Sequence, residues 1–146
     1  FTAIPNFRFS CEAPDKRSHI FVTAIRDDSG LAKMPDMDKE LLTLMLQAKR
    51  GLFPDIKVVE EGAVSVSGTK ALYQKCRYTD GQGVEALQVV TLEYMFLSAG
   101  TIYSFCASYP ATDEDAVFPL VKHSLSTFRV TTSSKEKIPS TENKAK

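Results

Sequence analysis

The chain has 146 residues, of which 43% are hydrophobic and 25% charged, and its 18 Lys and Arg residues balance 18 Asp and Glu residues. This composition is typical of a globular protein and excludes disorder throughout, and the length suits one soluble domain with a sizeable core. Nucleic-acid binders usually carry a basic excess, so the zero net charge argues against such a partner. No apolar stretch reaches the roughly 18 residues of a membrane-spanning helix, so we expect no transmembrane segment.

The first third of the chain predicts two strands and a helix. Residues 7–11 alternate, which places Phe7, Phe9 and Cys11 toward a core and Arg8 and Ser10 toward solvent. Residues 19–26 are apolar on both faces, as in a strand inside a sheet that is covered on both sides. Apolar residues then recur at helical spacing over residues 37–50, with Asp36 expected as N-cap and Gly51 as the residue that ends the helix.

The remainder of the ordered chain predicts strands followed by a second helix. Short strand signals cover residues 56–60 and 63–67, and longer ones cover 71–78, 84–98 and 101–109, linked by turns at 80–83 and 99–100. A helix is expected from Thr112, with Thr112 and Asp115 in a near capping box. Pro119 predicts either a kink or a regular helix that begins near Phe118.

The order of these elements predicts an α+β domain with layers. Hairpins join the later strands, so the central sheet should be mainly antiparallel, and two principal amphipathic helices must cover it. Residues 131–146 are rich in Ser, Thr, Lys and Glu, and we expect them to form a flexible polar tail. The expected organisation is a single domain over residues 1–130 followed by that tail.

Four short segments resemble the Mog1/PsbP-like superfamily. They are the opening strand that ends at a proline (residues 7–14), Gly68-Thr69-Lys70-Ala71 before a long hairpin, Gly100-Thr101-Ile102-Tyr103-Ser104-Phe105, and the helix end Ser126-Thr127-Phe128. The resemblance covers roughly residues 7–130. It implies an α/β/α sandwich with a central antiparallel sheet, and it implies no single activity, because members mostly bind or assist other proteins.

A search for chemistry finds no catalytic, metal or cofactor motif. His19 and His123 are the only histidines, no HExxH is present, and His123 and Ser124 are adjacent on a helix and do not face each other. The Gly81-Gln82-Gly83 segment is not followed by a helix, so a turn is favoured over a phosphate loop. We therefore predict no catalytic residues, no metal ligands, no cofactor and no enzymatic activity.

The three cysteines are expected to be structural. Cys11, Cys76 and Cys106 each fall within a predicted strand, where a buried thiol behaves as a small hydrophobic group. An odd number leaves either one disulfide with a free thiol or three free thiols. The five tyrosines, Tyr73 and Tyr103 among them, are interpreted as sheet packing in preference to a binding surface.

Two functional hypotheses follow from these observations. The first is a non-enzymatic protein-binding or accessory protein, exported or lipoprotein-derived in preference to cytoplasmic because the chain begins with Phe1 and not Met. Its candidate partner surface combines Arg8 and Ser10 with the loop at residues 27–35, which includes Asp27, Asp28 and Lys33.

The alternative is a small-ligand-binding or enzymatic module. Its pocket would lie between sheet and helix, with polar groups from His19, Tyr73, Tyr103 or His123. A homodimer through an edge strand is a third possibility, because edge strands offer unpaired backbone groups.

Overall fold

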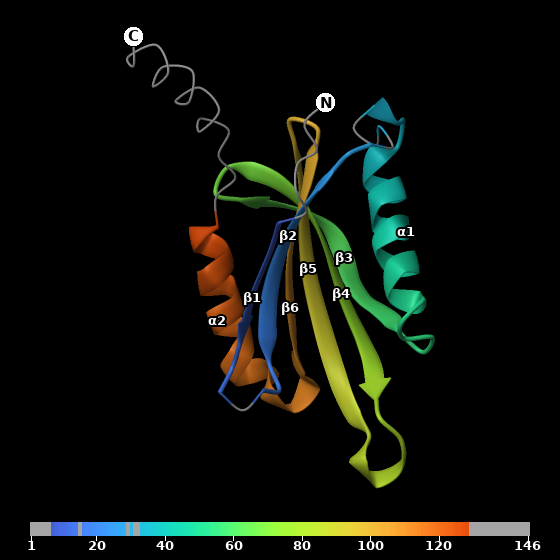
Figure 1. The fold of residues 1–146 in the computed structure, drawn as a ribbon, viewed down its shortest axis with the longest axis vertical. Helices are drawn as coiled ribbons and strands as arrows, with labels where there is room; N and C mark the ends of the chain where they lie inside the picture. The colour runs from blue at the N-terminus through green and yellow to red at the C-terminus, as the bar shows by residue number, and fades with distance from the viewer. Residues whose placement is uncertain (1–6, 15, 29, 31–32, 129–146) are drawn as a thin grey trace.

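The computed structural model describes residues 7–14, 16–28, 30 and 33–128, with the backbone alone for residues 7–10. Within this part of the chain six strands form one sheet and two helices cover it (Figure 1). The strands are β1 (Phe7–Glu12), β2 (His19–Arg26), β3 (Lys57–Val66), β4 (Thr69–Asp80), β5 (Leu87–Ser98) and β6 (Thr101–Pro110). The helices are α1 (Met37–Arg50) and α2 (Glu114–Thr127), with short 3-10 turns η2 (Gly83–Glu85) and η3 (Ala111–Asp113).

The sheet is antiparallel throughout, with strand order β1-β2-β6-β5-β4-β3. The two helices lie on opposite faces of it, as Figure 1 shows. The predicted α+β sandwich with a central antiparallel sheet and two principal helices is therefore confirmed. The predicted tail at residues 131–146 lies outside the described residues.

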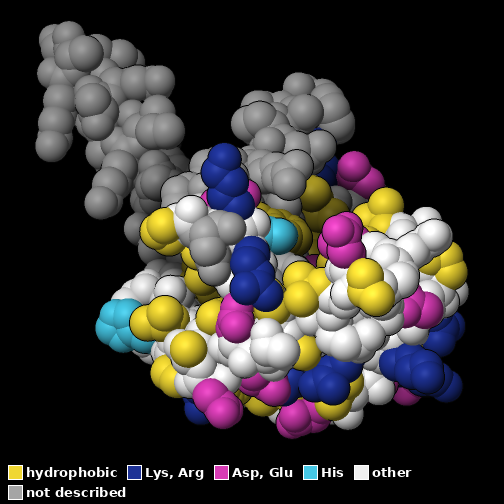
Figure 2. Space-filling model, turned by 90° about the horizontal axis from the view of Figure 1, so that it is seen from below, with side chains coloured by type: hydrophobic (Ala, Val, Ile, Leu, Met, Phe, Trp, Pro, Cys, Tyr) yellow, Lys and Arg dark blue, Asp and Glu magenta, His cyan; other side chains and the backbone are white. Residues whose placement is uncertain are grey.

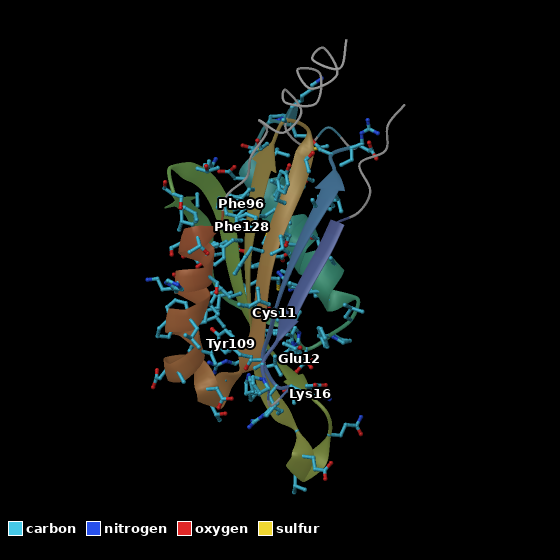
Figure 3. The ribbon with its side chains drawn as sticks, turned by 60° about the vertical axis from the view of Figure 1, so that its left-hand side comes forward. Cys11, Glu12, Lys16, Phe96, Tyr109 and Phe128 are labelled. Carbon is cyan, nitrogen blue, oxygen red and sulfur yellow. The ribbon has the colours of Figure 1, made fainter. Side chains whose placement is uncertain are left out.

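The main core lies between the sheet and α2. Side chains on alternate positions of β5 and β6 point to this face, because successive residues of a strand face opposite sides. They meet Val121 and Leu125 of α2, and Phe96 packs on Phe128 with ring centroids 5.2 Å apart (Figure 3). The core members on the strands are Ala71, Val90, Leu92, Tyr94, Phe96, Phe105, Ala107 and Tyr109.

The opposite face of the sheet is covered by α1 over only part of its width. This helix packs mainly on β4 and β3. Leu41 contacts the cluster that contains Leu72 and Ile102, and below the helix Phe53 stacks on Tyr78 with ring centroids 3.8 Å apart. The part of this face formed by β6 and β2 is therefore left partly open beside α1.

Asp36 and Gly51 lie at the two ends of α1 as predicted, but neither has the usual geometry of a cap. Asp36 lies at the start of the helix but has φ 56°, and its side chain makes no capping hydrogen bond. Gly51 has φ −62°, so the helix does not end in the left-handed turn that favours glycine. Instead the backbone N–H groups of Leu52 and Phe53 both donate to the carbonyl of Lys49, a tight turn that directs Phe53 back onto Tyr78.

The second helix begins later than the capping box at Thr112 predicts. Thr112 belongs to η3, its hydroxyl donates to Asp113, and no side chain caps the helix start at Asp113. The helix runs through Pro119, so the predicted start near Phe118 is wrong. Proline has no backbone N–H, so the carbonyl of Asp115 receives no helical hydrogen bond from residue 119. Both residues are exposed, so this carbonyl lies on the solvent side of the helix.

The two short strands expected at residues 56–60 and 63–67 are one continuous strand, β3. The register shifts between Val58 and Glu60, so Val59 sits in a bulge and its side chain is exposed. A bulge interrupts the alternation of a strand, and this one lies inside the first predicted segment, whereas the predicted break at residues 61–62 is continuous strand.

Candidate binding groove between α1 and the sheet

The α1 side of the sheet presents four cross-strand rows of side chains on β5, β6 and β2. The strand register fixes them, because residues that pair across strands share a face. From the end of α1 toward its beginning they are Thr91-Ser108-His19, Glu93-Cys106-Phe21, Met95-Ser104-Thr23 and Leu97-Ile102-Ile25. The rows change from polar to apolar along the sheet.

A groove of about 510 Å³ lies between these rows and α1. We call it the α1 groove. Leu41, Leu44 and Met45 line its helix side, and Met95, Ile102 and Cys106 are among the residues of its floor. The volume is within the usual range of small-molecule sites, and the lining is mainly apolar with a few polar groups.

The rim of the α1 groove carries exposed aliphatic side chains. Ile25 on β2 is 44% exposed, Leu44 on α1 is 45% exposed, and Leu52 after α1 is 74% exposed. These are three of the seven large hydrophobic residues that are exposed in the described part of the chain. Such a concentration of apolar surface around a concavity is typical of an interaction site.

A hydrogen-bonded ion pair crosses the lower part of the groove. Lys49 Nζ lies 2.6 Å from Glu93 Oε1, and both side chains are about 85% buried, with 14% and 15% of their surface exposed. The other carboxylate oxygen of Glu93 accepts a 2.6 Å hydrogen bond from the Ser104 hydroxyl. Within the described chain, Lys49 and Glu93 are the only Lys, Arg, Asp or Glu residues that line the groove, so its two formal charges cancel.

Lys49 also binds the side-chain amide of Gln74, which is fully buried. Lys49 Nζ donates to Gln74 Oε1 at 3.1 Å, and Gln74 Nε2 donates to the Leu42 carbonyl and to Glu61 Oε2. The network therefore ties α1 to β3, β4 and β5 through side chains whose polar atoms are satisfied, which fixes the helix at one position over the sheet.

Thr91 differs from these residues because its hydroxyl has no full hydrogen bond among the described residues, although the side chain is only 8% exposed. It lies opposite Cys76 in the register, and a weak hydrogen bond from its hydroxyl to that thiol opposes the increase in the pKa of Cys76 that burial causes. Thr91 also lines the α1 groove. A buried hydroxyl without a full hydrogen bond is costly.

The two thiols near the groove are protonated and unreactive in character. Burial raises the pKa of Cys76, and it raises that of Cys106 further. A nucleophilic cysteine needs a lowered pKa and an exposed position, so neither thiol is suited to catalysis. All three cysteines are free, which decides between the disulfide alternatives.

Cys11 does not follow the prediction of a buried thiol. It is exposed on the edge strand β1 (Figure 3) and lines a separate hollow of about 470 Å³ between β1, β2 and α2. The physical reason is its position at the border of the sheet, where α2 covers the strands less completely.

The four residues proposed for a sheet–helix pocket do not come together. His19 is exposed and lines the α1 groove, where it stacks on Phe21 with ring centroids 6.1 Å apart. Tyr73 lines a hollow of about 370 Å³ on the α2 side, and its hydroxyl donates to Glu60 at 2.6 Å. This hydrogen bond is the main cause that raises the pKa of Tyr73. Tyr103 and His123 line none of these hollows.

The residues of the predicted partner surface lie at two places, on the edge strand β1 and in the segment that follows β2. Arg8 and Ser10 pair with Thr23 and Phe21, so their backbone positions are on the edge strand next to the wall of the groove. Asp28 is exposed and forms a 3.4 Å ion pair with Arg26, and the backbone N–H of Asp27 donates to the Gly100 carbonyl. Lys33 is exposed, and its backbone N–H donates to Gly30. The role of this surface stays a prediction.

Charges on the lower end of the molecule are mixed. Figure 2 shows basic, acidic and hydrophobic side chains interspersed on this end, without a patch of one sign. In the described ranges no three His, Cys, Asp or Glu side chains gather as a metal site would require. Neither helix of the described chain is long and apolar enough to cross a membrane.

Comparison with solved structures identifies the fold. A protein of unknown function from Pseudomonas aeruginosa superposes with a TM-score of 0.66 at 10% identity, covering 90% of this chain and 87% of that one. CyanoP, the PsbP protein of Synechocystis sp. PCC 6803, superposes with a TM-score of 0.52 at 17% identity, covering 87% of this chain and 84% of CyanoP. The chain has the Mog1/PsbP-like fold.

The Ran-binding protein Mog1p of Saccharomyces cerevisiae is more distant. Its TM-score is 0.49 at 18% identity, and the match covers 77% of this chain and 61% of Mog1p. No protein-family profile and no curated protein sequence matches the chain. The likeness to the two structures described first, at 10% and 17% identity, establishes the fold alone and carries over no binding residue.

Sequence reasoning missed the residues that give the α1 groove its chemistry: Lys49, Gln74, Thr91, Glu93 and Ser104. A signal for part of this set was present, since Thr91 and Glu93 interrupt the most apolar stretch of the chain at alternate positions. Two polar residues that share one face of an otherwise buried strand indicate a polar feature of that face.

Proposed function

We propose that this protein is a non-enzymatic accessory protein that binds a partner protein by taking an apolar segment of it into the α1 groove. The observation that carries this proposal is the exposure of Ile25, Leu44 and Leu52 around one concavity. Hydrophobic side chains gathered in this way form the centre of many protein interfaces.

The charges of the groove define the partner further. Lys49 and Glu93 are paired with each other, so neither needs a charged group of the partner. A charge that enters such a groove loses its hydration without gaining a counter-ion. The segment that fits is therefore apolar and uncharged at its centre, and charged residues belong at its ends.

The surface predicted from sequence supports the same side of the molecule. The positions of Arg8 and Ser10 border the β2 wall of the groove, so a partner seated there would pass close to them. An exported location, a single domain over residues 1–130 and a homodimer through an edge strand belong to this proposal as further expectations.

A small-molecule ligand is the second candidate for the same groove. The observation that favours it is the mainly apolar lining of a volume of about 510 Å³, to which His19, Thr91 and Ser108 add a few polar side chains. Pockets of this size with a few converging polar groups are typical ligand sites.

The test of partner binding uses capture from lysate of the source organism with quantitative mass spectrometry, followed by affinity measurement with the purified partner. Leu44→Glu places a charge at an exposed position on the rim, so it should change the free energy of unfolding by less than about 0.5 kcal/mol. It should weaken the affinity at least about tenfold, because the carboxylate would be desolvated in the interface. Leu120→Glu on α2 is the matched control, since Leu120 is exposed but does not line the α1 groove.

A partner that both variants bind as well as the unchanged protein would refute docking in the groove. A partner lost instead when Arg8 and Lys33 are both changed to Glu would place the interface on the predicted loop surface. No specific partner of the unchanged protein would remove the accessory proposal.

A further inference from the structure

The hollow of about 370 Å³ on the α2 side of the sheet combines aromatic rings with charged side chains. We call it the α2 hollow. It lies between α2 and the strands β3, β4 and β5, on the face of the sheet opposite the α1 groove (Figure 1). The two sites have no lining residue in common, so an occupant of one leaves the other free.

The floor of the α2 hollow is an aromatic surface that is held in place. Gly62, Tyr73 and Tyr94 pair across β3, β4 and β5, so they share one face of the sheet. The Tyr73 ring lies over Gly62, since a Cβ at Gly62 would be 3.4 Å from Tyr73 Cε1, and its hydroxyl donates to Glu60 at 2.6 Å. It also stacks on Tyr94 with ring centroids 6.0 Å apart. A ring fixed on several sides offers a rigid face on which another aromatic ring can stack.

The helix side of the α2 hollow adds a third ring and positive charge. Phe118 of α2 lines it, and the Nζ atoms of Lys75 and Lys122 lie 5.7 and 5.5 Å from the centroid of the Phe118 ring. These distances are those of cation–π contacts, which keep both ammonium groups beside the ring. A ligand in the hollow therefore meets aromatic rings from the sheet and from the helix, with cations at its edge.

Only one of the charged side chains that line the α2 hollow lacks a hydrogen-bonding partner within the described chain. Lys75 donates to Glu114, and Glu60 accepts the hydrogen bond of Tyr73. Lys122 has neither an ion pair nor a hydrogen bond among the described residues, and its ammonium group is exposed beside Phe118. A carboxylate is the group that pairs with a free ammonium most favourably.

We propose that the α2 hollow binds a small planar aromatic carboxylate, with its ring between Tyr73 and Phe118 and its carboxylate paired with Lys122. A volume of about 370 Å³ lies at the small end of the usual range of ligand sites, which suits one or two fused rings. This inference goes beyond the proposed function, because it concerns the other face of the sheet.

The test is a titration of the isotope-labelled full chain, followed by backbone amide NMR shifts, with three probes that share one ring system. The probes are 2-naphthoate, 2-naphthalenemethanol and 2-naphthylmethylammonium. Saturable binding of 2-naphthoate is expected, with shifts centred on Tyr73, Phe118 and Lys122. The alcohol should bind about two- to fivefold more weakly, the usual effect of one exposed ion pair. The ammonium probe should bind more weakly still, because its charge has the same sign as that of Lys122.

The variant Lys122→Gln removes the charge at an exposed position. It should weaken 2-naphthoate about two- to fivefold and leave the affinity for 2-naphthalenemethanol unchanged. Lys39→Gln is the matched control, because Lys39 is exposed on α1 and does not line the hollow. Its affinity for 2-naphthoate should equal that of the unchanged protein.

The variant Tyr73→Leu keeps an apolar side chain and removes the aromatic face. It should weaken the acid and the alcohol alike, about two- to tenfold, the usual effect of one aromatic pair. Tyr103→Leu is its control, because Tyr103 is a half-buried tyrosine of the same sheet that lines none of the hollows. Lys122→Gln decides the outcome if Tyr73→Leu does not fold.

Four results would overturn the inference. They are no saturable binding of 2-naphthoate, equal affinity for the ammonium probe, an unchanged affinity in Lys122→Gln, and shifts centred on Met95 and Ile102 of the α1 groove in place of Tyr73. None of them bears on the capture of a partner protein, which Leu44→Glu tests on the other face of the sheet. The aromatic acid site and the accessory role can thus fail independently.

Discussion

Replacing Thr91 by valine should stabilise the free protein, which is unusual for a change in a packed sheet. The side chain is 8% exposed and its hydroxyl has no partner among the described residues. Mutational data place the cost of burying an uncompensated hydroxyl at about 1–3 kcal/mol. Because the Cys76 thiol is a weak neighbour and water can reach the groove, we take the lower end and expect a gain of about 1 kcal/mol.

Urea unfolding followed by circular dichroism measures this gain. With an m-value of about 2 kcal/mol/M, a gain of about 1 kcal/mol raises the midpoint by about 0.5 M at constant m. The melting temperature should rise by about 2–4 °C for a chain of this size. Thr43→Val controls for the exchange of threonine for valine, since the Thr43 hydroxyl is exposed and bonds only its own helix at the Lys39 carbonyl.

A loss of stability in Thr91→Val would refute the reasoning. It would mean that the hydroxyl is satisfied in the free protein, by an ordered water or by the Cys76 thiol.

Two further predictions concern charge and thiol chemistry. Lys75 donates a hydrogen bond to Glu114 and so lowers the pKa of that carboxyl below 4.5. The folded state then binds fewer protons than the unfolded state, so this contribution is complete above about pH 5 and is lost as pH falls through the folded pKa. Urea midpoints should therefore fall less steeply with acid in Glu114→Gln than in the unchanged protein. Ellman's reagent should label only the exposed thiol of Cys11 in the native chain, because the thiols of Cys76 and Cys106 are buried. All three thiols should react after unfolding. Rapid labelling of three thiols in the native chain would contradict this packing.

The elements of this fold were predictable because each obeys a local rule. The alternation over residues 71–78 and 101–109, the turns at Gly81 and Gly100, and the apolar stripe of α1 all express periods of two or 3.6 residues. Gly100 has φ 75°, the left-handed conformation that a tight hairpin turn requires and glycine adopts without strain. The resemblance in the opening strand and the last hairpin pointed to the fold that the solved structures confirm.

Local rules failed where the backbone departs from its usual geometry. Asp36 has the residue type of an N-cap but a left-handed backbone, and Val59 breaks the alternation of β3 because it lies in a bulge. Neither departure leaves a clear pattern in the sequence.

The candidate site was largely hidden because it is a property of strand order. Lys49 and Glu93 become an ion pair only when α1 crosses β4 and β5, and Thr91 shares a row with His19 only because β6 lies between β5 and β2. The pocket expected from His19, Tyr73, Tyr103 and His123 failed for the same reason. Residue type suggested candidates, but which face of the sheet each occupies depends on register.

The polar residues of the α1 face argue that this face is shaped for binding and not only for stability. A sheet covered by a helix is stabilised most simply by apolar side chains, and replacing a buried ion pair by such residues is often neutral or stabilising. The core of the α2 face is aromatic and aliphatic, and the ion pair on that side, Lys75–Glu114, is more exposed than the Lys49–Glu93 pair. The α1 face instead carries Gln74, Thr91 and Glu93 beneath a helix that leaves β2 and β6 partly uncovered. Satisfied polar groups hold α1 at one distance from the sheet, so the residues that fix the helix also keep the groove beside it open.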